Sequence, residues 1–192
     1  NAAAFMPGLT DHTVTLVFRI SATLSKTICL PALETALAAI APRFPYYLVL
    51  LRRGFFWYYL EPAGTKSLRV SADSKFPCLN MKSRGGRYLF RVRAYDSRIA
   101  VEFCHILTDG TGALTFFKAL LLEYGESIGL EIPEAQGIFT AGGIPDPEES
   151  EDAFNRHAWV GTPHPGPVPR AFHLPALPLR RGQYRIITGK IP

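Results

Sequence analysis

The chain has 192 residues, 47% of them hydrophobic, so it is long enough for one sizeable core and too apolar for a disordered protein. Its 21 basic and 16 acidic residues give a net charge of +5, which favours an anionic partner such as a nucleotide-bearing cofactor, a nucleic acid or a membrane surface. The three cysteines form no CxxC pair, which excludes a disulfide framework and favours a cytoplasmic protein. No apolar run approaches the ~20 residues that cross a bilayer, so we expect a soluble chain.

Hydrophobic periodicity predicts a strand, a helix and a hairpin in the first sixty residues. Apolar and polar residues alternate over 13–21, as in a strand with one buried face. A short amphipathic helix follows, with Pro31 at its start and Pro42 at its end. The runs Tyr46–Leu51 and Phe55–Leu60 predict a hairpin, and we expect the aromatic residues of its second arm to pack in the core or at the sheet edge.

The next seventy residues predict a short strand, a second hairpin and a longer helix. The short strand is expected near Leu68–Val70, and the arms of the hairpin are Tyr88–Tyr95 and Ile99–His105. Apolar residues at spacings of three and four predict a helix over Ala113–Ile128, and Gly129 is placed to cap its C-terminus.

The most informative segment is His-Ile-Leu-Thr-Asp-Gly, residues 105–110, between the second hairpin and the longer helix. His105 closes a strand, so a ligand can reach it at the strand end. Neighbouring strand residues point to opposite faces, which places Phe103 on the side of His105 and Cys104 on the other side. The parity argues against a thiol nucleophile formed by Cys104 and His105.

This His-x-x-x-Asp-Gly pattern resembles the motif of the chloramphenicol acetyltransferase-like superfamily of CoA-dependent acyltransferases, which includes condensation domains, plant acyltransferases and alcohol acetyltransferases. The upstream helix beginning at Pro31 and the segment Pro42-Arg-Phe-Pro45 fit the same family. In its overall sequence pattern the chain most resembles the alcohol acetyltransferase-like branch. The resemblance implies an α/β (α+β) fold, with a mixed, largely antiparallel sheet packed with helices, as in the N-terminal half of these enzymes.

The resemblance also implies a mechanism. His105 would act as general base on an alcohol or amine acceptor, which attacks the thioester of acyl-CoA, or of a carrier-protein thioester, without an acyl-enzyme. The thioester is a co-substrate, so no permanently bound cofactor is expected. Asp109 would hold the turn through an arginine, for which Arg19 and Arg43 are candidates and Arg19 is preferred. Gly110 would allow a backbone conformation closed to larger residues and leave room beside the histidine.

The family resemblance predicts the organisation of the chain as well. Residues 1–132 would be the motif-bearing N-terminal domain, and 133–182, where nine of the 16 prolines lie, a Pro/Gly-rich loop or linker. Residues 183–192, with a strand at Tyr184–Thr188, would start the crossover toward a C-terminal domain of the same polypeptide. The family's second-domain motif, Asp-Phe-Gly-x-Gly, is absent here. We therefore expect this chain alone to be inactive.

Two other classes of function stay open. One is a non-catalytic binding or partner-docking module of the same fold. The other is a basic nucleic-acid-binding domain, although solvated charges on a strand face are the commoner explanation of such a pattern. Its interleaved residues are Arg84, Arg87, Tyr88, Phe90, Arg91, Arg93 and Tyr95. A metal site is not expected, because the remaining histidines lie at no metal-binding spacing. They are His12, His157, His164 and His173.

Overall fold

The computed structural model describes residues 15–64, 67–81, 87–133 and 136–151, together with Arg156, Gly166 and Pro167. The chain divides into two compact units, residues 1–150 and 151–192, and the helices and strands with described bounds all belong to the first. Within the described ranges, no helix is both long and apolar enough to cross a membrane.

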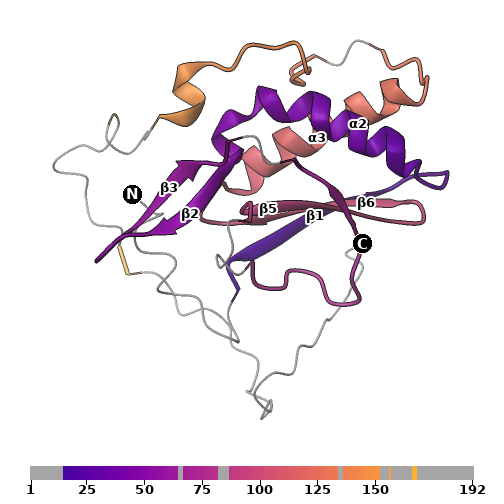
Figure 1. Cartoon of the computed structure of the whole chain (residues 1–192). Helices are drawn as coiled ribbons and strands as arrows, with labels where there is room; N and C mark the ends of the chain where they lie inside the picture. Colours follow the sequence, from indigo (N-terminus) through magenta and orange to yellow (C-terminus); the bar gives the residue numbers. More distant parts are fainter. Residues whose placement is uncertain are drawn as a thin grey trace. The chain divides into compact units, whose positions relative to one another are not determined.

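The first unit contains a four-stranded sheet, whose strands lie in the spatial order β1-β6-β5-β4 (Figure 1). Its strands are β1 (Val17–Thr23), β4 (Val70–Ala72), β5 (Phe90–Tyr95) and β6 (Arg98–Cys104). β6 pairs antiparallel with both β1 and β5, whereas the short edge strand β4 runs parallel to β5. The sheet is therefore mixed and mostly antiparallel, as predicted.

Two helices, α2 (Leu30–Ile40) and α3 (Gly110–Ser127), pack against each other on one face of this sheet (Figure 1). In α2 the apolar residues Leu33, Leu37 and Ile40 are buried, which follows from their spacing of three and four. Pro31 stands in the first turn, where its missing N–H is not needed, and the helix ends before Pro42. The helices and the mixed sheet confirm the predicted α+β fold class.

Both ends of α3 are fixed by local hydrogen bonds. The helix begins at Gly110, three residues before the predicted start, because the Asp109 side chain caps it. At the C-terminus Gly129 has a φ of 77°, and its N–H donates to the carbonyl of Glu126. The N–H of Leu130 reaches the carbonyl of Gly125, which completes a Schellman motif and confirms the predicted glycine cap.

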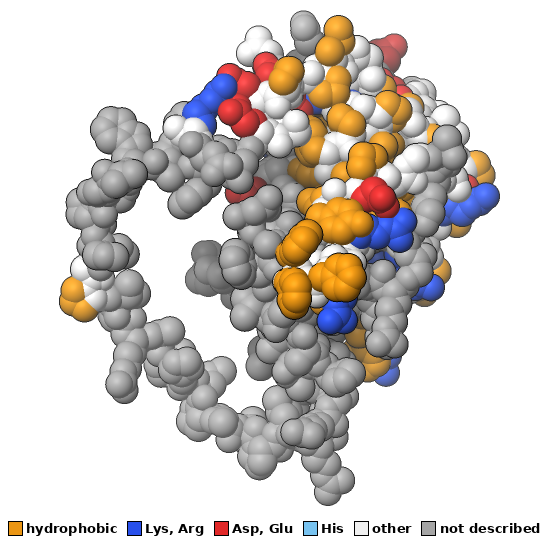
Figure 2. Space-filling model, turned by 60° about the vertical axis from the view of Figure 1, so that its left-hand side comes forward, with side chains coloured by type: hydrophobic (Ala, Val, Ile, Leu, Met, Phe, Trp, Pro, Cys, Tyr) orange, Lys and Arg blue, Asp and Glu red, His pale blue; other side chains and the backbone are white. Residues whose placement is uncertain are grey.

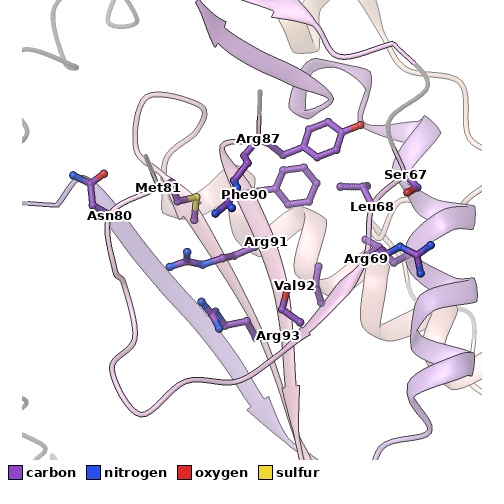
Figure 3. Close-up of a pocket in the computed structure, with 13 residues that line it drawn as sticks. Ser67, Leu68, Arg69, Asn80, Met81, Arg87, Phe90, Arg91, Val92 and Arg93 are labelled. Atoms are coloured by element: carbon purple, nitrogen blue, oxygen red, sulfur yellow. The ribbon is translucent and has the colours of Figure 1, made fainter. Parts of the chain in front are cut away.

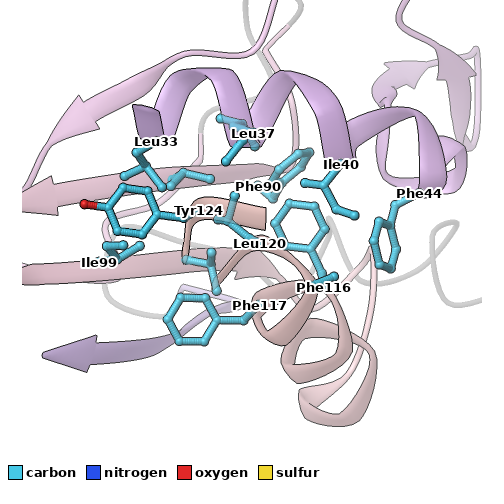
Figure 4. Close-up of a cluster of buried hydrophobic side chains, with 14 of the residues drawn as sticks. Leu33, Leu37, Ile40, Phe44, Phe90, Ile99, Phe116, Phe117, Leu120 and Tyr124 are labelled. Atoms are coloured by element: carbon cyan, nitrogen blue, oxygen red, sulfur yellow. The ribbon is translucent and has the colours of Figure 1, made fainter. Parts of the chain in front are cut away.

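Aromatic rings fill the core between the helices and the sheet (Figure 4). The ring of Phe116 on α3 lies edge-on to four others, with centroids 5.1 Å from Phe44, 5.4 Å from Phe90, 5.6 Å from Phe103 and 5.9 Å from Tyr47. Such edge-to-face pairs add to the free energy of burying the rings. The packing holds β6, which leads to His105, firmly against α3.

The first predicted hairpin forms a sheet of its own from β2 (Val49–Arg53) and β3 (Tyr58–Pro62). The 3-10 helix η3 (Pro45–Tyr47) replaces the start of its predicted first arm, and a second 3-10 helix, η2 (Ala41–Arg43), precedes it. The expectation that its aromatic residues pack inward is wrong at the tip, where Phe55 and Phe56 are 91% and 94% exposed. They lie in the connection between the strands and not on a sheet face. Figure 2 turns this side forward and shows hydrophobic side chains gathered beside basic ones.

Residues after 132, predicted to begin a linker, contribute to the first unit where the structure describes them. Ile138, Phe139 and Ala141 pack against the core, and η4 (Pro147–Ser150) closes the unit. Burial of these apolar side chains favours packing of the segment against the core, which its high proline content did not indicate. The predicted strand at Tyr184–Thr188 lies outside the described residues.

Candidate active site

His105 follows β6 directly and is exposed. Its backbone N–H donates to the carbonyl of Leu16 at 2.6 Å, which extends the pairing of β1 and β6 by one residue. Its ring lies 5.0 Å from the ring of Phe18, and Phe18 in turn stacks on Phe103 at 6.3 Å. The ring contacts place His105 and Phe103 on the same side of the strand, as the strand parity predicted.

The turn after His105 is fixed by three hydrogen bonds. The Asp109 carboxylate accepts from the Gly112 N–H at 2.9 Å, and the N–H of Leu107 donates to the carbonyl of Cys104 at 2.9 Å. The hydroxyls of Thr108 and Tyr47 lie 3.1 Å apart and share a hydrogen bond. Burial raises the pKa of Tyr47, so its phenol stays protonated. The histidine therefore stands beside a turn of defined geometry.

The glycine that this turn requires is Gly112. A Cβ there would overlap the Thr108 hydroxyl and lie 2.9 Å from the Tyr47 hydroxyl. At Gly110, by contrast, a Cβ would meet nothing within 4 Å, and the residue does not adopt a positive φ. The special backbone conformation predicted for Gly110 is absent, although open space does lie beside it. Sequence spacing gave no signal for Gly112, because its constraint comes from Tyr47, far away in the chain.

The predicted arginine partner of Asp109 is not found. Arg19 donates to Asp73 at 2.6 and 2.8 Å and to Glu102 at 3.1 Å. In the register of β1 and β6, Arg19 stands directly opposite Glu102, so its side chain lies on the face of the sheet away from the helices.

Arg43, the other predicted partner of Asp109, is also engaged elsewhere. It forms a two-pronged ion pair with Glu149, with distances of 2.6 and 2.7 Å, and its guanidinium lies 3.9 Å from the centroid of the Phe139 ring. The Arg43 guanidinium lowers the pKa of Glu149 to about 2. Across the described part of the chain, no arginine forms an ion pair with Asp109. Asp109 holds the turn as a helix cap.

A group of charged residues, hereafter the charged cluster, covers the sheet face opposite the helices. Its members are Arg19, Asp73, Arg91, Arg93, Arg98 and Glu102. Glu102 is fully buried at its centre, 2.5 Å from Arg91 and 3.3 Å from Arg93, and it accepts from the Cys78 N–H at 3.1 Å. Burial alone would raise the pKa of Glu102, but the Cys78 N–H and the arginines outweigh burial and hold the pKa below its ordinary value. Sequence reasoning missed this cluster.

The other candidate chemistries find no support at His105. Cys104 is buried against Leu51 and Leu89, and burial raises the pKa of its thiol, so it supplies no thiolate beside the histidine. Among the residues that the structure describes, no three His, Cys, Asp or Glu side chains are grouped as metal ligands. The remaining histidines, His12, His157, His164 and His173, lie outside the described residues.

A pocket of about 760 Å³ opens where β4 and β5 diverge (Figure 3). Arg91 and Arg93 line it from β5, but Phe90, which alternates with them in sequence, is only 3% exposed and belongs to the aromatic core. Because Phe90 is almost inaccessible, it offers no ring face on which a base could stack beside these arginines, whereas Tyr88 lines the same pocket. Arg84, a further residue of that pattern, lies outside the described ranges.

No protein-family model and no curated protein matches the chain. Among solved structures, it is similar to the SgcC5 protein from Streptomyces globisporus, solved with a naphthyl ethanediol and sucrose, at 17% identity and a TM-score of 0.48, covering 65% of this chain and 33% of that one. It is also similar to the complex of the X-domain and OxyB from teicoplanin biosynthesis, at 16% identity and a TM-score of 0.48, covering 68% of this chain and 32% of that one.

A third similar structure concerns condensation domain-mediated chain release from the enacyloxin polyketide synthase. It shares 18% identity with a TM-score of 0.41, over 62% of this chain and 28% of that one. At these identities the likeness concerns the fold. The chain spans about a third of the length of these structures.

Proposed function

We propose that the chain is the motif-bearing half of a CoA-dependent acyltransferase in which His105 is the general base. The observation that carries the proposal is the position of the histidine. It is exposed at the end of a firmly packed strand, beside a turn fixed by Asp109 and by the pairing of Tyr47 with Thr108. A base in such a place can meet a substrate without a change in the fold.

The proposed reaction is direct acyl transfer. Neutral His105 takes the proton of an acceptor hydroxyl or amine as the acceptor oxygen or nitrogen bonds to the thioester carbonyl carbon. The carbon–sulfur bond then breaks, and the departing thiolate takes the proton from the imidazolium, so the enzyme returns to its starting state. Catalysis of this kind contributes roughly 10²–10⁴-fold. The donor is acyl-CoA or a carrier-protein thioester, and the proposed branch of the superfamily is the alcohol acetyltransferase-like one.

Asp109 has a structural role in this proposal. Its carboxylate caps α3 through the Gly112 N–H, which ties the start of the helix to the residues that follow His105. Because no second base is needed for direct transfer, an aspartate engaged in this way does not compete with the histidine. The open space beside Gly110 is available to a substrate.

A partner-docking module of the same fold is the second candidate, favoured by the exposed tip of the β2–β3 hairpin. Phe55, Phe56 and Trp57 are 91%, 94% and 55% exposed there. Exposed aromatic groups of this kind commonly mark binding surfaces. The docking function needs no chemistry at His105.

The two candidates differ in turnover by the full-length natural protein that contains these residues. Incubation with acyl-CoA and a panel of alcohols and amines, followed by measurement of the free CoA thiol, tests for transfer. An acyltransferase releases CoA faster when an acceptor is present and forms the acylated acceptor in equal amount. Release that no acceptor accelerates would favour the docking module. We expect the 192-residue chain alone to show no turnover.

A further inference from the structure

The pocket between β4 and β5 has the size and charge of a ligand site. Its volume of about 760 Å³ lies within the range of small-molecule sites. The arginines that line it are Arg69, Arg87, Arg91 and Arg93. None of the described residues that line it is acidic, so no carboxylate at the wall would repel a bound anion.

Two of these arginines are held in place from behind. Arg91 donates to Glu102 at 2.5 Å and to the carbonyl of Leu79 at 2.8 Å, while Arg93 donates to Glu102 at 3.3 Å and to the carbonyl of Ala72 at 2.8 Å. A guanidinium has more N–H groups than these bonds use, so donors remain for a ligand. Ordering these side chains in advance lowers the entropy lost on binding.

The other two arginines carry charge that no described residue neutralises. Arg69 and Arg87 are exposed, and neither forms an ion pair or hydrogen bond with any described residue. Figure 3 shows Arg87 on the same side of β5 as Arg91 and Arg93, while Arg69 lies across the pocket on the β4 side. Glu102 is shared by Arg91, Arg93 and Arg19, so one carboxylate faces several guanidiniums.

Apart from the arginines, the wall combines apolar and aromatic side chains with three small polar ones, Ser67, Ser71 and Asn80. Leu37, Leu68, Met81 and Val92 line the pocket together with the ring of Tyr88. An arginine fork recognises phosphate through paired, charge-assisted hydrogen bonds, and an apolar wall suits the organic part of the same molecule. We propose that this pocket binds an organic phosphate, with Arg87, Arg91 and Arg93 on the phosphate oxygens. The proposal does not depend on acyl transfer at His105.

Titration calorimetry of the 192-residue chain at low salt tests the site with three probes: ADP, inorganic pyrophosphate and adenosine. We expect ADP and pyrophosphate to bind and adenosine to bind much more weakly. Tighter binding of ADP than of pyrophosphate would show that the apolar wall contributes, whereas equal binding would show that phosphate alone is recognised. Failure of both phosphates to bind, or adenosine binding as tightly as ADP, would overturn the proposal.

Arg87→Gln is the decisive variant, because Arg87 has no structural partner in the described residues and its loss leaves the fold intact. We expect about a tenfold loss of pyrophosphate affinity, as for one hydrogen bond to a charged group. Arg53→Gln removes the same charge from an exposed position outside the pocket and serves as the matched control. An equal loss in both variants would mean that only net charge attracts the anion, and would contradict the site.

His105→Ala separates this proposal from the proposed function. Phosphate binding that survives in His105→Ala is expected, since His105 does not line the pocket. If acyl transfer were never found, the calorimetry would still decide whether the pocket binds phosphate. If the pocket failed to bind phosphate, the test of transfer would be unaffected.

Discussion

The two faces of the sheet are covered by opposite kinds of side chain, aromatic rings on the helix face and ion-paired charges on the other. On the helix face, Phe103 of β6 stands between Phe18 and Phe90 of the neighbouring strands. The centroids of these rings lie 6.3 and 5.2 Å from that of Phe103. One residue earlier, on the other face, Glu102 stands in the same register between two arginines, Arg19 and Arg91. Both central residues are fully buried.

The contrast shows that burial does not by itself fix residue type. The phenylalanine triplet gains free energy from leaving water, in proportion to the apolar area covered. The charged triplet gains little in net terms, because Coulomb attraction is offset by the loss of hydration. Removing one member is nevertheless costly, since the partners are then left without a counter-charge. The apolar face of this strand therefore drives folding, whereas the charged face adds little net stability and is still sensitive to the loss of one member.

The largest effect is expected from Phe103→Ala. Removing this ring leaves a cavity among Phe18, Phe90 and Phe116, and we expect a loss of about 3–5 kcal/mol in the free energy of unfolding. Urea denaturation measures it. Phe56→Ala is the matched control, because Phe56 is 94% exposed, and it should change stability by less than about 0.5 kcal/mol. Equal effects of the two changes would contradict the described core.

Glu102→Gln is the corresponding change on the charged face. It removes the buried charge that faces three arginines, and we expect a loss of about 2–4 kcal/mol, somewhat less than for Phe103 because the arginines can still reach water. Glu61→Gln provides the control, since Glu61 and Arg52 form a pair with exposures of 45% and 46%. A pair in solvent should contribute about 0–1 kcal/mol. A Glu102 effect as small as that of Glu61 would argue against a structural role for the charged cluster.

Gly112→Ala tests the turn where the helix face meets His105. The added Cβ would overlap Thr108 and crowd Tyr47, and we expect a net loss of about 1–3 kcal/mol in thermal or urea unfolding. Gly110→Ala adds the same methyl group to open space and should leave stability unchanged or raise it by up to about 1 kcal/mol. Reversal of this order would show that the turn is constrained at Gly110 instead.

The smallest effect is expected from mild acid, which protonates carboxylates on the charged face and leaves the rings of the helix face unaffected. The pKa of Glu102 and that of Asp73 are lowered in the folded protein, for Asp73 chiefly by the Arg19 hydrogen bond. The unfolded state therefore binds more protons below about pH 4.3, so stability should fall as pH falls from about 5 to 3. Glu102→Gln should show a shallower fall than the wild type, and Phe103→Ala the same fall. If stability fell equally with pH in the wild type and both variants, Glu102 would not contribute to the acid sensitivity.

Local patterns predicted much of the fold, and long-range pairing accounts for the rest. Alternation and spacing located the second hairpin and both helices, and Gly129 marked the end of α3, because these features depend on residues close in sequence. The ion pair of Arg43 with Glu149 joins positions 106 residues apart, and no local signal links them. Charged residues allow many pairings, and only tertiary geometry chooses among them.

In the candidate site, too, local features were predictable from the sequence and long-range contacts were not. The exposure of His105 at a strand end and its parity with Phe103 follow from the strand pattern. The partner of Asp109 does not, because Arg19 is directed to Glu102 by the register of β1, which the sequence leaves open. Gly112 was missed for a similar reason, since its constraint comes from the Tyr47 hydroxyl.

The most direct test of the central claim is the rate of acyl transfer in the full-length protein carrying His105→Ala, with its unfolding free energy measured on the same sample. Because the side chain is exposed, stability should change by less than about 1 kcal/mol. Acceptor-dependent release of CoA should fall by roughly 10²–10⁴-fold if His105 is the base. A folded His105→Ala protein that transfers the acyl group at the wild-type rate would contradict the proposed function.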